Sequence, residues 1–69
     1  MLRFKAPDMS CGHCARAVAE AIRAVDPAAR VEVDLPRREV AVDGATADAG
    51  ALARALGEAG YPAERLPGG

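Results

Sequence analysis

The chain has 69 residues, a formal net charge of -1 at pH 7, and one phenylalanine, one tyrosine and no tryptophan. A chain of this length forms one small domain with a modest core, so we expect a single domain over residues 1–69, with 67–69 as a frayed tail. The small net charge argues against a nucleic-acid surface, and no apolar run is long enough for membrane insertion. The first residues, MLRFKAPD, lack the apolar core of a signal peptide, so we expect a cytoplasmic protein.

The first two predicted elements are a strand and a helix. Residues 2–6 alternate between apolar and basic side chains, which predicts a strand with one buried face. Over residues 12–25 the apolar side chains recur every three or four positions, which predicts an amphipathic helix that Pro27 ends. The apolar face of this helix comprises Ala15, Val18, Ala21, Ile22 and Val25.

A hairpin is predicted next. Residues 30–35 alternate between charged and apolar side chains, and in residues 39–42 the valines alternate with Glu39 and Ala41. The two runs are separated by a short segment with Pro36-Arg37, which is typical of a tight turn. Two alternating runs joined in this way predict a β-hairpin with its valines and leucine facing the core.

The remaining residues predict a second helix and a last strand. The helix is expected over residues 48–59, started by a cap from Thr46 or Asp48 and ended by Gly60 in the left-handed conformation. Residues 61–66 then form a short strand. The side chains that this second helix is expected to bury are Leu52, Ala55, Leu56 and Ala59.

The predicted order is strand, helix, strand, strand, helix, strand. Apolar and polar side chains alternate along every predicted strand. One face of the sheet is therefore expected to be exposed to solvent and the other covered, as in antiparallel sheets. Both helices must then cover the same face. We therefore predict an α+β, ferredoxin-like sandwich, in which a four-stranded antiparallel sheet carries two helices on one face.

The segment MSCGHC, residues 9–14, holds both cysteines of the chain. Cys14 falls in the first turn of the first predicted helix, and Cys11 comes just before it. A helix N-terminus offers free N–H groups and a partial positive charge, and both favour thiolate over thiol. Thiolate attacks disulfides and also binds metals, so the local sequence is compatible with either chemistry.

Thiol–disulfide exchange is one alternative, because CGHC is also the sequence of disulfide-exchange centres. Sites of the thioredoxin type usually have tryptophan before the first cysteine and belong to a longer chain. Here Ser10 precedes Cys11, and the chain has no tryptophan. A small thiol-disulfide oxidoreductase is therefore kept as the alternative from a different functional class.

The other alternative is a soft-metal site. Met9, Cys11 and Cys14 form an M-x-C-x-x-C motif, and Gly60-Tyr61 precedes the last predicted strand. Together with the element order, these residues resemble the heavy-metal-associated domain family over essentially the whole chain. That family includes bacterial Cu(I) chaperones and the metal-binding domains of metal-pumping P-type ATPases. The family usually has glycine before the methionine, where this chain has Asp8, a residue type that tolerates unusual backbone angles better than most.

The resemblance implies a metallochaperone that binds one Cu(I) between Cys11 and Cys14. The protein would pass copper by thiolate ligand exchange to the metal-binding domain of a copper-transporting P-type ATPase, and it would not be an enzyme. Thiolates select soft ions and so favour Cu(I), whereas Zn(II) usually takes four ligands. Ag(I) and Hg(II) would bind by the same chemistry. A detoxification module for Zn(II) or Hg(II) is the remaining alternative function.

Three further side chains are candidates for roles near the thiolates. His13 is an accessory metal ligand, above all in a copper-bridged homodimer, or a group that tunes the thiolates, or an exposed spacer. The resemblance implies that Met9 packs under the loop rather than binding the metal. Tyr61 is either the aromatic cap of the last strand or, by resemblance to bacterial chaperones, a group close to the thiolates.

Overall fold

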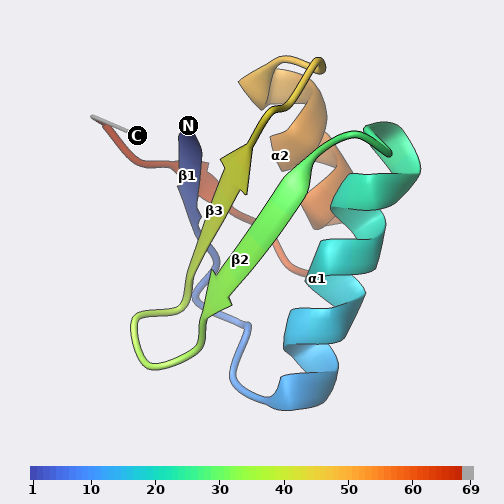
Figure 1. Ribbon diagram of the computed structural model, residues 1–69. Coiled ribbons are helices and arrows are strands. Elements are labelled where there is room, and N and C mark those ends of the chain that lie inside the picture. The colour runs from blue at the N-terminus through green and yellow to red at the C-terminus, as the bar shows by residue number, and fades with distance from the viewer. Residues whose placement is uncertain (68–69) are drawn as a thin grey trace.

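Four strands form one antiparallel sheet, and two helices cover one of its faces (Figure 1). The computed structural model describes residues 1–67. The elements are β1 (Leu2–Lys5), α1 (Gly12–Val25), β2 (Arg30–Asp34), β3 (Glu39–Asp43), α2 (Ala49–Glu58) and β4 (Glu64–Arg65). The predicted α+β, ferredoxin-like fold is confirmed. The frayed tail predicted over residues 67–69 falls mostly outside the described residues.

The strand order is β2-β3-β1-β4, so β1 and β3 are central and β2 and β4 form the edges. All pairings are antiparallel. Lys5, the last residue of β1, lies opposite Glu39, the first residue of β3. The loop that leaves β1 therefore begins beside the turn between β2 and β3.

The core lies between the sheet and the helices. Two positions predicted to face the core are wrong, since Val25 is 45% exposed and Ala59 is also exposed. Both residues lie where a helix ends, and at the end of α1 the inward position is taken by Asp26 instead. The largest fully buried apolar side chains are Phe4, Met9, Val18, Ile22, Val40, Val42, Leu52 and Leu56.

The last strand is shorter than predicted, with two residues in place of residues 61–66. The N–H of Tyr61 is used at the end of α2, where it donates to the Leu56 carbonyl at 2.9 Å. Pro62 has no N–H to donate to a neighbouring strand. Pairing with β1 therefore begins only beyond these two residues, and the N–H of Leu66 donates to the Arg3 carbonyl at 2.7 Å.

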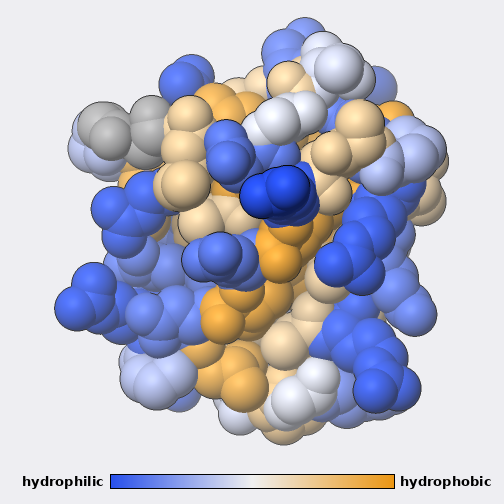
Figure 2. Space-filling model, in the orientation of Figure 1, coloured by the Kyte–Doolittle hydropathy of each residue, from blue (hydrophilic) through white to orange (hydrophobic). Residues whose placement is uncertain are grey.

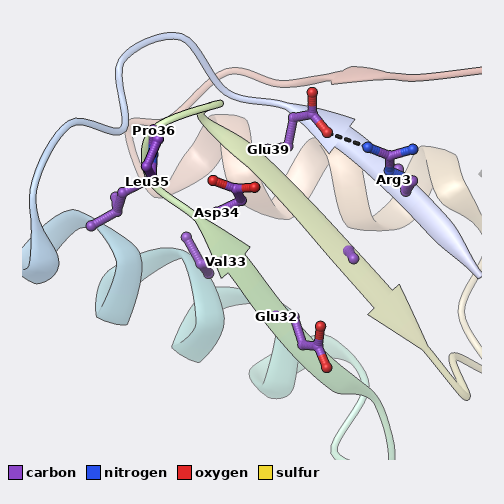
Figure 3. A pocket seen from close by; sticks show the side chains of 8 residues that line it. Arg3, Glu32, Val33, Asp34, Leu35, Pro36 and Glu39 are labelled. Atoms are coloured by element: carbon purple, nitrogen blue, oxygen red, sulfur yellow. Dashed lines mark hydrogen bonds and ion pairs between the residues drawn. The ribbon is translucent and has the colours of Figure 1, made fainter.

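Among residues 1–67, no helix lies on the other face of the sheet. Arg3 of β1 and Glu39 of β3 form an ion pair on it, beside a hollow of about 560 Å³ (Figure 3). The hollow is lined by strand residues and by the turn after β2, not by the cysteine-bearing segment. Figure 2 shows an apolar band between hydrophilic surfaces on the side of the molecule where β2 forms the edge. Within residues 1–67 neither helix has the length and apolarity needed to cross a membrane.

Asp26 is the one buried charged residue among those described. Its carboxylate accepts hydrogen bonds from the backbone N–H groups of Thr46 and Ala47 and from the Thr46 hydroxyl. These bonds tie the end of α1 to the loop before α2. They also lower the pKa of Asp26, and the bond from the Ala47 N–H has the largest effect.

Asp26→Asn is expected to lower the thermal stability at neutral pH, because the amide is a weaker acceptor and its NH₂ group faces N–H donors. Since folding lowers the pKa of Asp26, its contribution is fully present above the unfolded value of about 3.9. It is lost as the pH falls through the folded-state pKa. Thermal unfolding followed by circular dichroism should therefore show a difference in Tm between wild type and variant that becomes smaller in acid. Glu32→Gln, at an exposed site, is the control, and a difference that does not change with pH would contradict the assignment.

Candidate metal centre

The two cysteines follow a tight turn on the loop that joins β1 to α1 (Figure 1). The N–H of Met9 closes this turn by donating to the Ala6 carbonyl at 3.1 Å. Pro7 occupies the second position of the turn, where its fixed φ fits. Among the described residues Arg38 is the one non-glycine residue with a positive φ, so Asp8 is not left-handed. The loop therefore needs no glycine at position 8.

Met9 and its neighbours have opposite environments. The Met9 side chain is fully buried in the core, whereas Ser10 and Cys11 are exposed. The chain therefore passes from a buried residue to an exposed cysteine within two positions. The buried Met9 side chain anchors the loop in the core, and Cys11 lies at the surface.

Cys11 is the N-cap of α1, and Cys14 lies in its first turn. The backbone at Cys11 is extended, and its sulfur accepts the Cys14 N–H at 3.4 Å. The two Sγ atoms are 3.1 Å apart, and both cysteines are free. No acidic residue occupies the first turn, so the partial positive charge of the helix N-terminus is available to a thiolate.

The end of α2 determines where Tyr61 lies. Gly60 has φ +94°, the left-handed conformation that the sequence predicts. The Gly60 N–H donates to the Gly57 carbonyl at 3.1 Å and the Tyr61 N–H donates to the Leu56 carbonyl, which together form a Schellman motif. After this turn Tyr61 packs half-buried against the core, with its hydroxyl toward the Cys14 sulfur.

The surroundings of Cys14 favour its thiolate. The Tyr61 hydroxyl has the largest effect, followed by hydrogen bonds from Cys11 and from the Ser10 backbone. Together they lower the pKa of Cys14 from 9.0 to about 6. The same contact raises the pKa of Tyr61, because a phenol that stabilises a thiolate is harder to ionise. These contacts therefore favour the ionised sulfur, which is the form that binds metals.

Tyr61→Phe is expected to raise the pKa of Cys14 from about 6 toward its ordinary 9.0, because the hydroxyl that stabilises the thiolate most is removed. The alkylation rate of the metal-free protein should then reach its midpoint at higher pH, since only the thiolate reacts. The two proteins compared are Cys11→Ser and Cys11→Ser/Tyr61→Phe, so that Cys14 is the single reactive thiol in both and the loss of the Cys11 hydrogen bond is common to both. Equal midpoints with and without the hydroxyl would show that Tyr61 does not act on Cys14.

His13 lies exposed on the first turn of α1, between the two cysteines. Residues 1–67 contain no cluster of three or more His, Cys, Asp or Glu side chains placed to hold a metal ion. Within this one chain, His13 is therefore not assembled with the two cysteines into a three-ligand group. Its role as an accessory ligand stays a prediction.

The arrangement of the two sulfurs suits a dithiol that opens to take up a metal. A metal–thiolate bond measures about 2.3 Å, so an ion in line between two sulfurs needs more than their present 3.1 Å separation. Cys11 can supply this movement, because its side chain is exposed and can rotate about its Cα–Cβ bond. Cys14 lies in the helix and is half-buried, so loading is expected to rotate the Cys11 side chain outward while the loop backbone keeps its path.

One residue near the loop was missed by the sequence analysis. The Arg38 guanidinium donates from Nη1 to the Pro7 carbonyl at 3.0 Å, and Pro7 lies in the turn before the cysteines. The sequence indicates a turn at Pro36-Arg37 but carries no signal that the next arginine takes a positive φ. Glycine, asparagine and aspartate are the usual residues in that conformation.

The model of the heavy-metal-associated domain matches residues 3–62. No curated protein matches the chain. Among solved structures, the chain is similar to a gold binding protein, with 35% identity and a TM-score of 0.91 over 96% of this chain and 100% of the other. It is similar to the copper chaperone Atx1 from Synechocystis PCC6803, with 31% identity and a TM-score of 0.88 over 93% of this chain and 100% of that one.

A third similar structure is oxidized MerP from Ralstonia metallidurans CH34, with 28% identity and a TM-score of 0.78 over 93% of this chain and 92% of the other. The three solved structures share the fold over more than nine-tenths of both chains compared. The family model covers both cysteines, both helices, β2, β3 and all of β1 except its first residue. The chain belongs to the heavy-metal-associated domain family.

Proposed function

We propose that the protein is a Cu(I) chaperone in which Cys11 and Cys14 hold one Cu(I) ion as cargo. The observation that carries this proposal is the pair of sulfurs, 3.1 Å apart where the loop from β1 meets the first turn of α1, with Cys11 exposed. Two thiolates form a soft site of low coordination number, and such ligands select Cu(I) over harder ions. The similarity to the copper chaperone Atx1 supports the same cargo.

Delivery proceeds by exchange of metal–sulfur bonds. Cys11 is exposed and Cys14 is half-buried, so an incoming thiolate approaches Cu(I) from the Cys11 side. That thiolate bonds to the ion, Cys11 leaves, and a second thiolate then displaces Cys14. Metal–sulfur bonds alone form and break, so the protein is a carrier and not an enzyme.

The proposed recipient is the metal-binding domain of a copper-transporting P-type ATPase. A recipient with its own Cys-x-x-Cys offers two thiolates of the same kind, so copper can move without passing through water as a free ion. The transfer is placed in the cytoplasm, where thiols are kept reduced. Transfer of Cu(I) to such a domain on mixing, followed by gel filtration and metal analysis, tests the pairing.

The choice of cargo is tested by titrating the reduced protein with Cu(I) and Zn(II) in competition. One Cu(I) per chain is expected, and Cu(I) should displace Zn(II), because two thiolates supply only half of the usual zinc ligand set. Ag(I) and Hg(II) should compete with Cu(I), and the similarity to a gold binding protein adds Au(I) to the ions to test. Retention of Zn(II) in the presence of Cu(I) would favour the detoxification module.

The oxidoreductase alternative makes a different prediction. A disulfide-exchange enzyme would reduce an added protein disulfide catalytically, with turnover sustained by glutathione. The chaperone is expected to show copper binding and no such turnover. An insulin-reduction assay on the metal-free protein separates the two functions.

His13 is proposed as a ligand only when two chains share copper. Its imidazole is exposed beside the sulfurs, so a second chain can approach it, whereas a third strong ligand within one chain would slow release to the recipient. His13→Ala is therefore expected to weaken the dimerisation of the copper-loaded protein and leave one Cu(I) per monomer in dilute solution. Analytical ultracentrifugation with and without copper measures this, and unchanged dimerisation would make His13 a spacer.

A further inference from the structure

Arg38 has an unfavourable backbone conformation at the end of the turn between β2 and β3. Its φ is +56°, in the left-handed region that residues other than glycine and asparagine seldom adopt. Its N–H closes the turn by donating to the Leu35 carbonyl at 3.1 Å. Glycine would fit this position without strain, so the presence of arginine indicates a contact that only a side chain can make.

That contact lies on the cysteine-bearing loop. The Arg38 carbonyl accepts the Ala6 N–H at 2.8 Å, and its guanidinium donates to the Pro7 carbonyl at 3.0 Å. The bonds therefore reach two successive residues at the start of the loop. Figure 3 shows the turn after β2 lying beside the loop that leads from β1 to α1. The next bond along the loop is from the Met9 N–H to the Ala6 carbonyl.

These contacts fix the path of the loop almost to the first cysteine. Pro7 is held by Arg38, and Met9 is held by its buried side chain. Only Ser10 separates Met9 from Cys11, so little chain is left free to move before the sulfur. Holding the loop in this path keeps Cys11 where its sulfur accepts the Cys14 N–H and lies 3.1 Å from the Cys14 sulfur.

We propose that Arg38 is a positioning residue of the metal site, which acts from the opposite hairpin by holding the Pro7 carbonyl. The side chain reaches neither cysteine through a hydrogen bond among the described residues, and it acts through the backbone of the loop. In the metal-free protein this contact holds the loop backbone that carries Cys11 in place before an ion arrives, so only the Cys11 side chain has to move when the two sulfurs separate. A loop that is already ordered loses less freedom on binding, so the metal is held more tightly.

The metal-binding test uses two adjacent exposed arginines as a matched pair. Arg38→Ala keeps the backbone strain and removes the guanidinium, whereas Arg37→Ala removes an equal charge whose side chain forms an ion pair with Asp34. Arg38→Ala is expected to weaken Cu(I) binding about fivefold, the change that corresponds to one net hydrogen bond of average strength. Arg37→Ala should stay within about twofold of wild type, and Arg38→Lys, which retains a donor, should recover most of the loss.

The copper-binding test of Arg38 rests on the proposed function. A second measurement needs no metal, so it tests the role of Arg38 independently of that function. In the metal-free Arg38→Ala protein, amide hydrogen exchange of Met9 and Cys14 is expected to accelerate about fivefold. Exchange at Ile22 and Val40, which lie in the core, should not change. If the wild-type protein does not bind copper, the chaperone assignment is refuted. The hydrogen-exchange measurement still tests the role of Arg38 in that case.

Three results would overturn the role of Arg38. The first is exchange at Met9 and Cys14 equal to that of the wild type. The second is acceleration of the core amides by the same factor, which would mean a general loss of stability. The third is an equal loss of Cu(I) affinity in Arg37→Ala, which would mean that charge alone is responsible.

Discussion

Replacing Cys11 or Cys14 with serine is expected to abolish tight Cu(I) binding while the domain remains folded. Each change removes one of two thiolates and leaves a hydroxyl, which is a hard, protonated oxygen at neutral pH. Structural metal sites with four ligands contribute roughly 10–16 kcal/mol in total, so losing one ligand should weaken binding at least about 100-fold. Native mass spectrometry of each variant, with one equivalent of Cu(I) and a competing chelator, measures the loss.

The fold should survive both changes for separate reasons. At position 11 serine is itself a preferred N-cap, so the start of α1 keeps an acceptor for the Cys14 N–H. At position 14 the side chain is only half-buried, and serine is slightly smaller. Ser10→Ala, at an exposed neighbouring site, is the control for copper binding. A single serine variant that still holds one Cu(I) tightly per monomer would refute the two-thiolate site.

Much of the fold is predictable because it depends on patterns within short segments. The alternation of Val31 and Val33 with charged neighbours, and the three- and four-residue spacing around Val18 and Ile22, follow directly from strand and helix geometry. The bounds of α1 agree with the prediction, because Pro27 cannot continue a helix. Asp48 rather than Thr46 caps α2, a choice that the sequence leaves open.

The parts that could not be predicted depend on contacts between distant segments. Thr46 does not cap α2 because its N–H and hydroxyl bind Asp26, twenty residues earlier. Nothing in the local sequence marks Asp26 as buried, since a charged residue before proline normally lies in solvent. The contact from Arg38 to Pro7 likewise joins residues 31 positions apart.

The candidate site also has features that the local sequence predicts and features that depend on contacts between distant segments. The motif itself places Cys11 and Cys14 at the start of a helix, and Gly60 predicts the turn that ends α2. The meeting of Tyr61 with Cys14 requires the relative placement of both helices, which no local pattern contains. Sequence reasoning therefore identifies candidate ligands more readily than the neighbours that tune them.

Met9→Ala is expected to reduce the free energy of unfolding by roughly 2–5 kcal/mol, the usual effect of emptying a buried methionine site. The Met9 side chain is fully buried among core residues, so few neighbours can move in without disturbing the sheet or the helices. A small domain has a total stability on the order of 5 kcal/mol, so a loss near the upper end of this range would leave the variant partly unfolded. Urea unfolding measures the loss, and Val25→Ala, at a site that is 45% exposed, is the control.

Met9→Leu then separates packing from metal binding. Leucine preserves most of the volume, so the change should cost less than about 1.5 kcal/mol. Leucine has no sulfur, so any metal–thioether bond is lost. Because the proposed ligands are Cys11 and Cys14, Met9→Leu should bind one Cu(I) per chain with nearly wild-type affinity. A loss comparable to that of the serine variants would instead make Met9 a ligand, and the loop would then have to lift a fully buried side chain to reach the ion.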